Sequence, residues 1–322
     1  MMRYTDRHCR FFLRQITRRS LLYTEMITTQ ALEHGNRAHF LRFDPIEHPV
    51  AVQLGGSEPQ ALARSSRYAE QWGYDEVNLN VGCPSDRVTT GRMGACLMKE
   101  PMLVADCVRA MRDAVTIPIT VKHRIGVDGR DSQQELVDFV GQVAEAGCRT
   151  FIVHARIAIL KGLNPKENRD IPPLQYERVY QLKETFPDLE IIINGGIKEM
   201  GHARELLRHV DGVMIGREAY HNPWILAAAD SILFGQPAAQ PDRHDVVRKM
   251  VPYIEQQLAS RSCTFGQIAR HMLGLFNGMA GARRYRRYLS ERMNRKEASA
   301  ALLQEAGALC MTREHLTAGE PG

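Results

Sequence analysis

A cysteine lies where a strand-like run of the sequence gives way to a loop, because Glu76–Val81 is followed by Gly82, Cys83 and Pro84. A thiol in this position is a candidate nucleophile, metal ligand, general acid or packing group. No Cys or His stands at ligand spacing around it, so we expect no metal site. The seven cysteines are an odd number without a Cys-x-x-Cys pair. This pattern argues against a disulfide framework and indicates a reduced cytoplasm.

The protonation state of a thiol separates two of these roles. An ordinary thiol, with a pKa of about 8.5, keeps its proton at neutral pH. A proton donor needs that proton, whereas a nucleophile needs a neighbouring charge or base that lowers the pKa. The chemistry is consistent with an acid, and it leaves the nucleophilic and packing roles open.

One face of the predicted strands is apolar, and the other carries polar side chains towards the strand ends. Gln53 lies on this second face, and Asn80, Lys122 and His154 lie on it in the strands that follow. Asn194 takes the equivalent place on a later strand. Active sites of (β/α)8 barrels gather at the carboxyl ends of the strands. Five strands with polar groups at one rim therefore predict a site there.

Strand-like and helical segments alternate roughly every 25–40 residues, which is typical of βα units around a parallel sheet. Helical patterns such as Pro59–Trp72, Met102–Val115 and Gln134–Ala146 separate the strands. A TIM barrel, the (β/α)8 fold, needs eight strands. Residues 6–19 are already helical, so we expect the first strand to precede Met1. The seven predicted strands are Leu21–Ile27, Val50–Leu54, Glu76–Val81, Ile117–Arg124, Thr150–Arg156, Glu190–Gly195 and Gly212–Arg217.

Two glycine elements follow the last predicted strands. "INGGI" (193–197) and "MIGRE" (214–218) place Gly195–Gly196 and Gly216–Arg217 in loops that commonly hold a phosphate in barrels. Lys122 and His154, one strand apart, would then face a flat anionic ring such as reduced flavin. Alternatively the glycines are plain turns, Lys122 neutralises an inward acid such as Glu25, and His154 is merely hydrogen-bonded.

The last quarter of the chain differs in charge and pattern. Residues 1–240 carry 29 Lys and Arg against 29 Asp and Glu, whereas residues 241–322 carry 13 against 8, which accounts for the formal excess of +5. A Pro-punctuated segment, 234–242, precedes helical patterns at Asp245–Leu258 and Cys263–Gly281. We expect a catalytic barrel domain over 1–235 and an all-helical domain with a tail over 236–322. Such a basic region binds nucleic acid or is a solvated helical face.

Several motifs resemble the tRNA-dihydrouridine synthases. "LNVGCPSDRV", "GRMGACLMKEP", "VKHRIGVD", "VHAR", "LKGLNPKENR" and "IGREAYHNPW" stand in that family's order and spacing over about residues 1–290. The opening "TDRHCRFF" and the "LKGLNPKENR" segment are similar to the A subfamily. The resemblance implies a barrel that holds FMN, uses NADPH as reductant, and saturates the C5–C6 bond of uridines 20 and 20a in the D-loop of tRNA.

The resemblance also implies roles for individual residues. Cys83 is the general acid: C6 of the uridine accepts a hydride from FMN, and the thiol protonates C5 from the opposite side. The positions that match FMN-binding residues are Met1, Met2, Gln53, Lys122, His154, Asn194, Gly195, Gly196, Gly216 and Arg217. The positions that match tRNA-contacting residues are Asn80, which faces the uridine, with Lys166, Arg169, Arg283 and Arg286. In "ARRYRRYL" (282–289), arginines suit phosphates and tyrosines offer nearby aromatic surface.

Two other functions fit part of the pattern. A flavin barrel acting on a free pyrimidine, similar to dihydroorotate dehydrogenase, would explain the flavin and phosphate features but not the basic helical region. A tRNA-binding protein without a flavin would explain that region alone. No stretch approaches the roughly 18 uninterrupted apolar residues of a membrane span. We expect a cytoplasmic, monomeric enzyme whose partner is tRNA, with no membrane contact.

Overall fold

The computed structural model describes residues 1–322 except 86–87, 89, 237–241 and 311–322. Most of the predicted linker and the predicted tail therefore lie outside the described residues. Two compact units divide the chain: one combines Met1–Arg3 with Leu21–Gly216, and the other combines Tyr4–Ser20 with the chain from Arg217 onward. The functional boundary expected between residues 235 and 236 stays a prediction.

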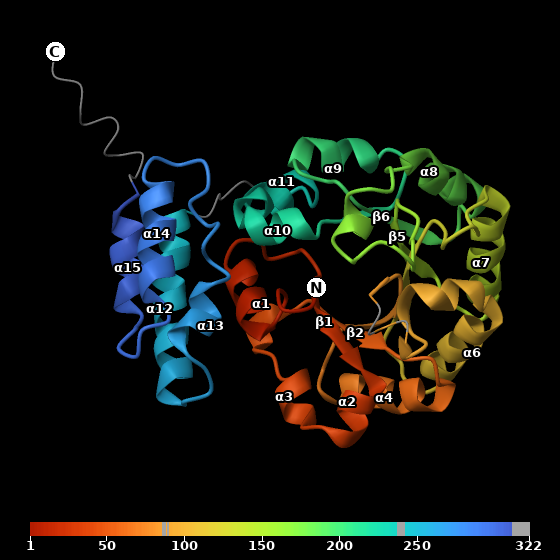
Figure 1. Ribbon diagram of the computed structural model, residues 1–322, viewed down its shortest axis with the longest axis horizontal. Coiled ribbons are helices and arrows are strands. Elements are labelled where there is room, and N and C mark those ends of the chain that lie inside the picture. Colours follow the sequence, from red (N-terminus) through yellow and green to blue (C-terminus); the bar gives the residue numbers. More distant parts are fainter. Residues whose placement is uncertain (86–87, 89, 237–241, 311–322) are drawn as a thin grey trace, which may run out of the picture. The chain divides into compact units, whose positions relative to one another are not determined.

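Seven parallel strands form the sheet of the first unit and pair in chain order from the first to the last. The sheet curls into a half-barrel with helices outside it, which confirms the expected TIM-barrel class (Figure 1). All seven predicted strands are present, within a few residues of their expected bounds. The strands are β1 (Leu22–Thr28), β2 (Val50–Gly55), β3 (Glu76–Val81), β4 (Ile119–Arg124), β5 (Thr150–His154), β6 (Glu190–Asn194) and β7 (Gly212–Met214).

Buried apolar side chains hold this sheet against the helices. Val50, Val52 and Leu54 alternate along β2 and are fully buried, as expected where helices cover the outer face of a parallel sheet. The helices begin at clear signals: Ser132 forms a capping box with Glu135 at the start of α7. The helices of this unit are α2 (Thr29–His34), α3 (Arg37–Leu41), α4 (Pro59–Gln71), α6 (Pro101–Arg112), α7 (Gln133–Glu145), α8 (Tyr176–Thr185) and α9 (Met200–Leu206), with 3-10 turns η1 (Pro45–Glu47), η2 (Gly94–Lys99) and η3 (Glu167–Arg169).

The two outer strands, β1 and β7, each have one neighbouring strand within the described residues. The backbone N–H of Arg3 donates to the carboxylate of Glu25 on β1. A Cβ placed on Gly216, just after β7, would lie 3.7 Å from the sulfur of Met1. The first three residues of the chain therefore lie against β1 and beside the loop that follows β7.

The second unit is helical. Its first helix, α1 (Arg7–Arg14), is shorter than the predicted 6–19. Beyond the end of this helix, the guanidinium of Arg14 donates to the carbonyls of Thr17 (2.9 Å) and Ser20 (2.8 Å). The helices are α1 (Arg7–Arg14), α10 (Arg217–His221), α11 (Ala229–Ile232), α12 (Arg243–Ala259), α13 (Phe265–Ala269), α14 (Ala282–Arg292) and α15 (Ala301–Ala308), with the 3-10 helix η4 (Pro223–Ala228).

The single helix predicted over Cys263–Gly281 is wrong for most of its length, because only α13 is α-helical and turns follow it. Gly278 and Gly281 have φ values of +82° and +90°, which belong to left-handed turns rather than to a helix. A Cβ on Gly274 would lie 2.3 Å from the carbonyl oxygen of His221. These glycines permit turns and a close backbone approach that other residues would resist.

Candidate active site

Cys83 lies at the carboxyl end of β3, where its backbone is held from two sides. Its N–H donates to Oδ1 of Asn80 at 3.0 Å, and its carbonyl accepts from the N–H of Ala95 at 2.9 Å. A Cβ on Gly94 would lie 2.5 Å from that carbonyl oxygen, so only glycine allows this approach. The half-buried thiol of Cys83 lies 3.6 Å from the hydroxyl of Ser85. The loop therefore presents a fixed, partly exposed S–H group.

A hydrogen bond joins two predicted site residues, Asn80 and Gln53, next to the thiol loop. Asn80 on β3 donates from Nδ2 to Oε1 of Gln53 on β2, at 2.8 Å. Gln53 in turn donates to Asn78 at 2.9 Å. Both Asn80 and Gln53 are half-buried. The structure thus brings together two residues that were assigned separately, one to the substrate and one to the cofactor.

Lys122 on β4 is paired with an amide rather than with an acid. Its Nζ donates to Oδ1 of Asn194 on β6 at 3.0 Å, so the alternative pairing with Glu25 is wrong. Burial, together with the charge of Arg124, lowers the pKa of the Lys122 amine to about 7, whereas Cys83 acts in the opposite direction. A buried amine without a carboxylate favours a site for an external anion.

The glycines after β6 form a backbone cradle. Gly195 and Gly196 have φ values of +123° and +71°, so both lie outside the range that side-chain-bearing residues prefer. A Cβ on Gly195 would lie 2.9 Å from the ring of His154, and one on Gly196 would lie 2.5 Å from the side chain of Leu174. Successive residues of this kind expose backbone N–H groups suited to an anion. His154 therefore lies beside the predicted phosphate loop.

The remaining predicted cofactor residues are Met1, Met2, Gly216 and Arg217. Met1 lies near Gly216, as described above, whereas the side chain of Met2 is 56% exposed. Arg217 is exposed, begins α10 and belongs to the second unit. The sequence marked Arg217 because it lies at the end of a predicted barrel strand. In the structure, α10 begins at this residue.

Two buried residues that no motif assigned hold the rim loops. Arg124, 3% exposed, donates from Nε to the carbonyl of Gly82 at 3.1 Å and from Nη1 to those of Ile157 (2.9 Å) and Asn168 (2.8 Å). Asn168 is fully buried, and its Nδ2 donates to Ile159 at 2.8 Å. The sequence marked Arg124 only as the last residue of a predicted strand.

Lys166 and Arg169 flank the buried Asn168 in the "PKENR" segment. Lys166 is exposed and precedes η3, and Arg169 is half-buried at its end. Because Arg124 bonds both this segment and Gly82, next to Cys83, the segment and the thiol loop share one buried guanidinium. The predicted tRNA-contacting segment is therefore anchored to the predicted acid.

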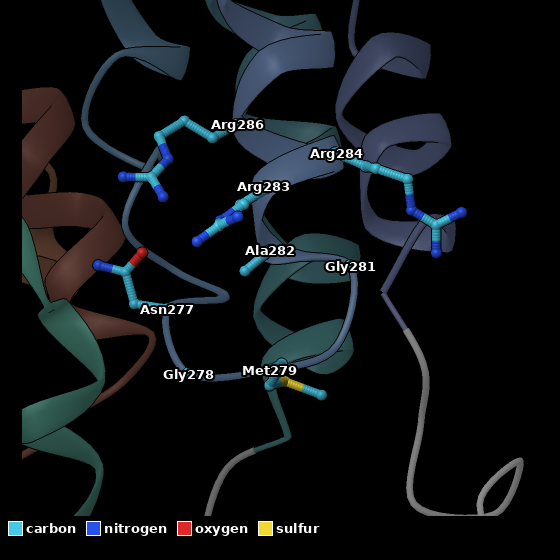
Figure 2. Close-up of a pocket in the computed structure, with 8 residues that line it drawn as sticks. All are labelled: Asn277, Gly278, Met279, Gly281, Ala282, Arg283, Arg284 and Arg286. Carbon is cyan, nitrogen blue, oxygen red and sulfur yellow. The ribbon is translucent and has the colours of Figure 1, made fainter.

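Figure 2 shows the amino-terminal part of α14, where arginines surround a surface cavity of about 520 Å³. Arg283 and Arg286 lie on the side of the helix nearer to Asn277, and Arg284 points to the other side. Within the described residues, no carboxylate forms an ion pair with Arg283 or Arg286. The cavity is lined by Asn277, Gly278, Met279, Gly281, Ala282, Arg283, Arg284 and Arg286.

Only one of the two tyrosines of "ARRYRRYL" is partly exposed, as the sequence suggested. Tyr285 is fully buried, and its hydroxyl donates to the carbonyl of Met272 at 3.0 Å. Tyr288 donates to the carboxylate of Glu305 at 2.5 Å and lies under the guanidinium of Arg292. Tyr285 therefore packs α14 within its own unit, whereas the ring of Tyr288 stays partly exposed among the arginines of the helix.

The described part of the chain has neither a membrane-spanning helix nor a cluster of metal-ligating side chains. No helix in this part of the chain is long and apolar enough to cross a membrane. No group of three or more His, Cys, Asp or Glu side chains in the same residues is placed to hold a metal ion.

The parallel half-barrel with polar side chains at its carboxyl rim defines the class, a (β/α)-barrel with a rim site. A model of the dihydrouridine synthase (Dus) family matches residues 1–310. A tRNA-dihydrouridine(20/20a) synthase of Pseudomonas aeruginosa is 62% identical over 290 residues, covering 90% of this chain and 87% of that relative. A protein of the same name from Salmonella typhi is 58% identical over 307 residues, covering 95% and 92%. The chain therefore belongs to the dihydrouridine synthase family.

A solved structure is similar in fold alone. It is a 2-naphthoyl-CoA reductase in complex with 2-naphthoyl-CoA, with a TM-score of 0.53 at 10% sequence identity. The similarity covers 74% of this chain and 48% of that protein. At this identity the likeness supports the barrel architecture and carries nothing about the substrate.

Proposed function

We propose that this protein is a tRNA-dihydrouridine synthase that reduces the C5–C6 bond of uridines 20 and 20a in tRNA, with FMN as cofactor and NADPH as reductant. The observation that carries the proposal is the thiol of Cys83, half-buried at the rim and fixed by Asn80. Relatives that are 62% and 58% identical bear the name of this activity, which supports the choice of substrate.

The residues at the rim fit a flavin mononucleotide. The Lys122 amine donates to the neutral amide of Asn194 and has a pKa that burial lowers to about 7, so an anionic ring beside it would stabilise its charged form. Gly195 and Gly196 allow the backbone of this loop to pass close to His154 and Leu174, where a Cβ would clash. We assign the ring to Met1, Met2, Gln53, Lys122, His154 and Asn194, and the phosphate to Gly195, Gly196, Gly216 and Arg217.

FMN held at these residues and reduced by NADPH would supply a hydride for C6 of the uridine. The thiol of Cys83 gives its proton to C5, so that the S–H bond breaks as the C5–H bond forms. Asn80 holds the loop in place during this transfer. The hydroxyl of Ser85, 3.6 Å from the sulfur, is the neighbouring group through which a proton returns.

Two buried cations stabilise the thiolate that remains. Burial lowers the pKa of Lys122 to about 7 and that of Arg124 to about 10, and charge on Cys83 opposes both shifts. The same attraction lowers the free energy of the ionised sulfur after it has given up its proton. We therefore assign Lys122 and Arg124 to stabilising the charge on the sulfur once it has given up its proton.

Exposed arginines and lysines supply the contacts to tRNA. We assign Lys166 and Arg169, anchored next to the thiol loop by Arg124, to the tRNA around the target base. Arg283 and Arg286, which line the cavity on α14, are assigned to backbone phosphates. Because the target base must leave the folded tRNA to reach the rim, the protein needs these contacts to hold the rest of the molecule.

The direct test uses the purified full chain, loaded with FMN and supplied with NADPH and an unmodified tRNA transcript. We expect NADPH oxidation coupled to a gain of two mass units at the D-loop uridines, and little reduction of uridine or uracil offered free. Equal reduction of the free pyrimidines would support a free-base reductase instead. Tight tRNA binding with no flavin uptake and no reduction would leave a tRNA-binding protein.

A further inference from the structure

A chain of hydrogen bonds runs inside the first unit from the start of β3 towards the Cys83 loop. At its origin lies Glu76, whose Oε1 accepts from the hydroxyls of Tyr23 and Thr120, each at 2.7 Å. Burial raises the pKa of Glu76, and the hydrogen bonds from Thr120 and Tyr23 oppose this rise. Because Thr120 gives its proton to the carboxyl oxygen, its own oxygen is left to accept from Nδ2 of Asn78 at 2.8 Å.

Thr120 fixes which atoms donate and which accept in the hydrogen bonds that follow, and three side-chain amides continue this order. Oδ1 of Asn78 accepts from Nε2 of Gln53 at 2.9 Å, and Oε1 of Gln53 accepts from Nδ2 of Asn80 at 2.8 Å. An amide presents oxygen at one end and NH₂ at the other, so the orientation of each fixes that of the next. The last oxygen, Oδ1 of Asn80, accepts from the N–H of Cys83 at 3.0 Å and of Gly82 at 3.1 Å.

We propose that Thr120 and Glu76 are positioning residues for Cys83, which fix the orientation of the amides of Asn78, Gln53 and Asn80 and so hold the thiol loop. The inference rests on the proposed function of Cys83. If Asn80 were reversed, its NH₂ group would meet the backbone N–H groups of Cys83 and Gly82, and two donors do not bond. The loop would then lose its hold at the end of β3.

Because the start of this network is buried, losing the orientation of its amides would destabilise the folded protein. Thr120 is 1% exposed and Asn78 is fully buried, so water has little access to a group whose partner is removed. A buried amide left without a partner destabilises the folded protein. Asn78 would therefore turn to find a partner, and Gln53 and Asn80 would have to follow.

The test compares three variants of the full chain. Thr120→Val keeps the shape of the side chain and removes the hydroxyl, and Thr120→Ser restores the hydroxyl. Tyr23→Phe is the matched control, because it removes the other hydrogen bond to Glu76 without interrupting the path to Cys83. Circular dichroism checks the fold of each, and Thr120→Ala replaces Thr120→Val if the latter does not fold.

Two measurements are made on each variant. The first is the alkylation rate of Cys83 by iodoacetamide, followed by peptide mass spectrometry, with the partly exposed Cys263 of the second unit as internal reference. The second is steady-state reduction of tRNA, with kcat and KM determined separately. The first needs neither tRNA nor reductant, so it decides the positioning role even if the proposed function fails.

We expect Thr120→Val to alkylate several-fold faster at Cys83, and to lose kcat by about tenfold, as one hydrogen bond of about 1.4 kcal/mol allows, while KM for tRNA stays unchanged. Thr120→Ser should restore both values, and Tyr23→Phe should alter neither. The proposal is overturned if Thr120→Val alkylates at the wild-type rate. It is also overturned if Thr120→Ser is as defective as Thr120→Val, or if Tyr23→Phe matches their defect.

Discussion

At the scale of residues, two groups are central: a thiol at the end of β3 and a half-buried amine that bonds to an amide rather than to an acid. Cys83 lies at a strand end with its backbone held by Asn80, and Lys122 bonds to the amide of Asn194. The thiol supplies the proton, and the amine supplies a positive charge at the place assigned to the flavin. Each of these two residues can be tested alone.

Replacing Cys83 by Ala should leave FMN content and tRNA affinity intact and slow uridine reduction about 10²–10⁴-fold, the usual contribution of a positioned proton donor. Cys96→Ala is the matched control, because its half-buried thiol donates to the carbonyl of Met93 in a neighbouring turn. Single-turnover reduction of tRNA by the reduced enzyme measures the effect. Wild-type rates in Cys83→Ala would remove this residue from the mechanism.

Lys122 should make the stability of the flavin-free protein depend on pH. Burial lowers its pKa to about 7, from an ordinary value of 10.5. Between these values the unfolded chain binds a proton that the native protein does not, so this group makes the free energy of unfolding rise with pH. Above pH 7 the contribution of Lys122 to the free energy of unfolding rises by up to about 1.4 kcal/mol per pH unit. Below pH 7 this contribution does not change with pH.

The measurement is the difference in urea-unfolding free energy between wild type and Lys122→Met from pH 6 to pH 9. The difference should be constant below pH 7 and should change in favour of wild type above it. Parallel curves across the whole range would show that Lys122 keeps its ordinary pKa in the folded protein.

The sequence predicted these two residues but not their supports. Cys83 and Lys122 stand out because of residue type at a strand end, which a single chain reveals. Glu76 and Thr120 act through partners on other strands, such as Thr120 on Asn78, and Arg124 acts through backbone carbonyls beyond the strand ends. Those partners depend on the register of β3 against β4, and a sequence without the fold does not give that register.

At the scale of elements, strands were predicted well and the basic region less well. Alternation such as Val50, Val52 and Leu54 marks a buried strand directly. The turns after α13 were missed, because the apolar spacing of that segment continues through Gly274 and Gly278. One tyrosine of α14, Tyr285, was expected at the surface but belongs to the core of its unit.

The cationic side of α14 should determine tRNA affinity. Arg283→Ala and Arg286→Ala should each weaken binding and reduce the slope of log K against log salt by about one, the value for one lost phosphate contact. Arg208→Ala, an exposed arginine that precedes β7 in the first unit, removes equal charge elsewhere and is the control. Binding of labelled tRNA across a salt series measures both.

NADPH oxidation in the absence of tRNA should be the same in all three arginine variants. If Arg283→Ala and Arg286→Ala bind tRNA as tightly as Arg208→Ala at every salt concentration, the assignment of α14 to tRNA is wrong.

At the scale of the whole molecule, charge and chemistry are divided along the chain. Residues 1–240 are balanced in charge and contain the rim site, whereas residues 241–322 carry the net excess of +5. This division suits an enzyme whose reactive groups need a defined polar setting and whose substrate is a large anion. The choice of positions 20 and 20a comes from the relatives, because no single residue of this chain encodes it.

The measurement that tests the central claim most directly is mass-spectrometric mapping of D-loop uridines in tRNA from a strain that lacks this gene. We expect positions 20 and 20a to be unreduced there, to become dihydrouridine when the wild-type gene is returned, and to stay largely unreduced with the Cys83→Ala gene. Dihydrouridine at both positions without the gene, or no gain when it is returned, would contradict the account.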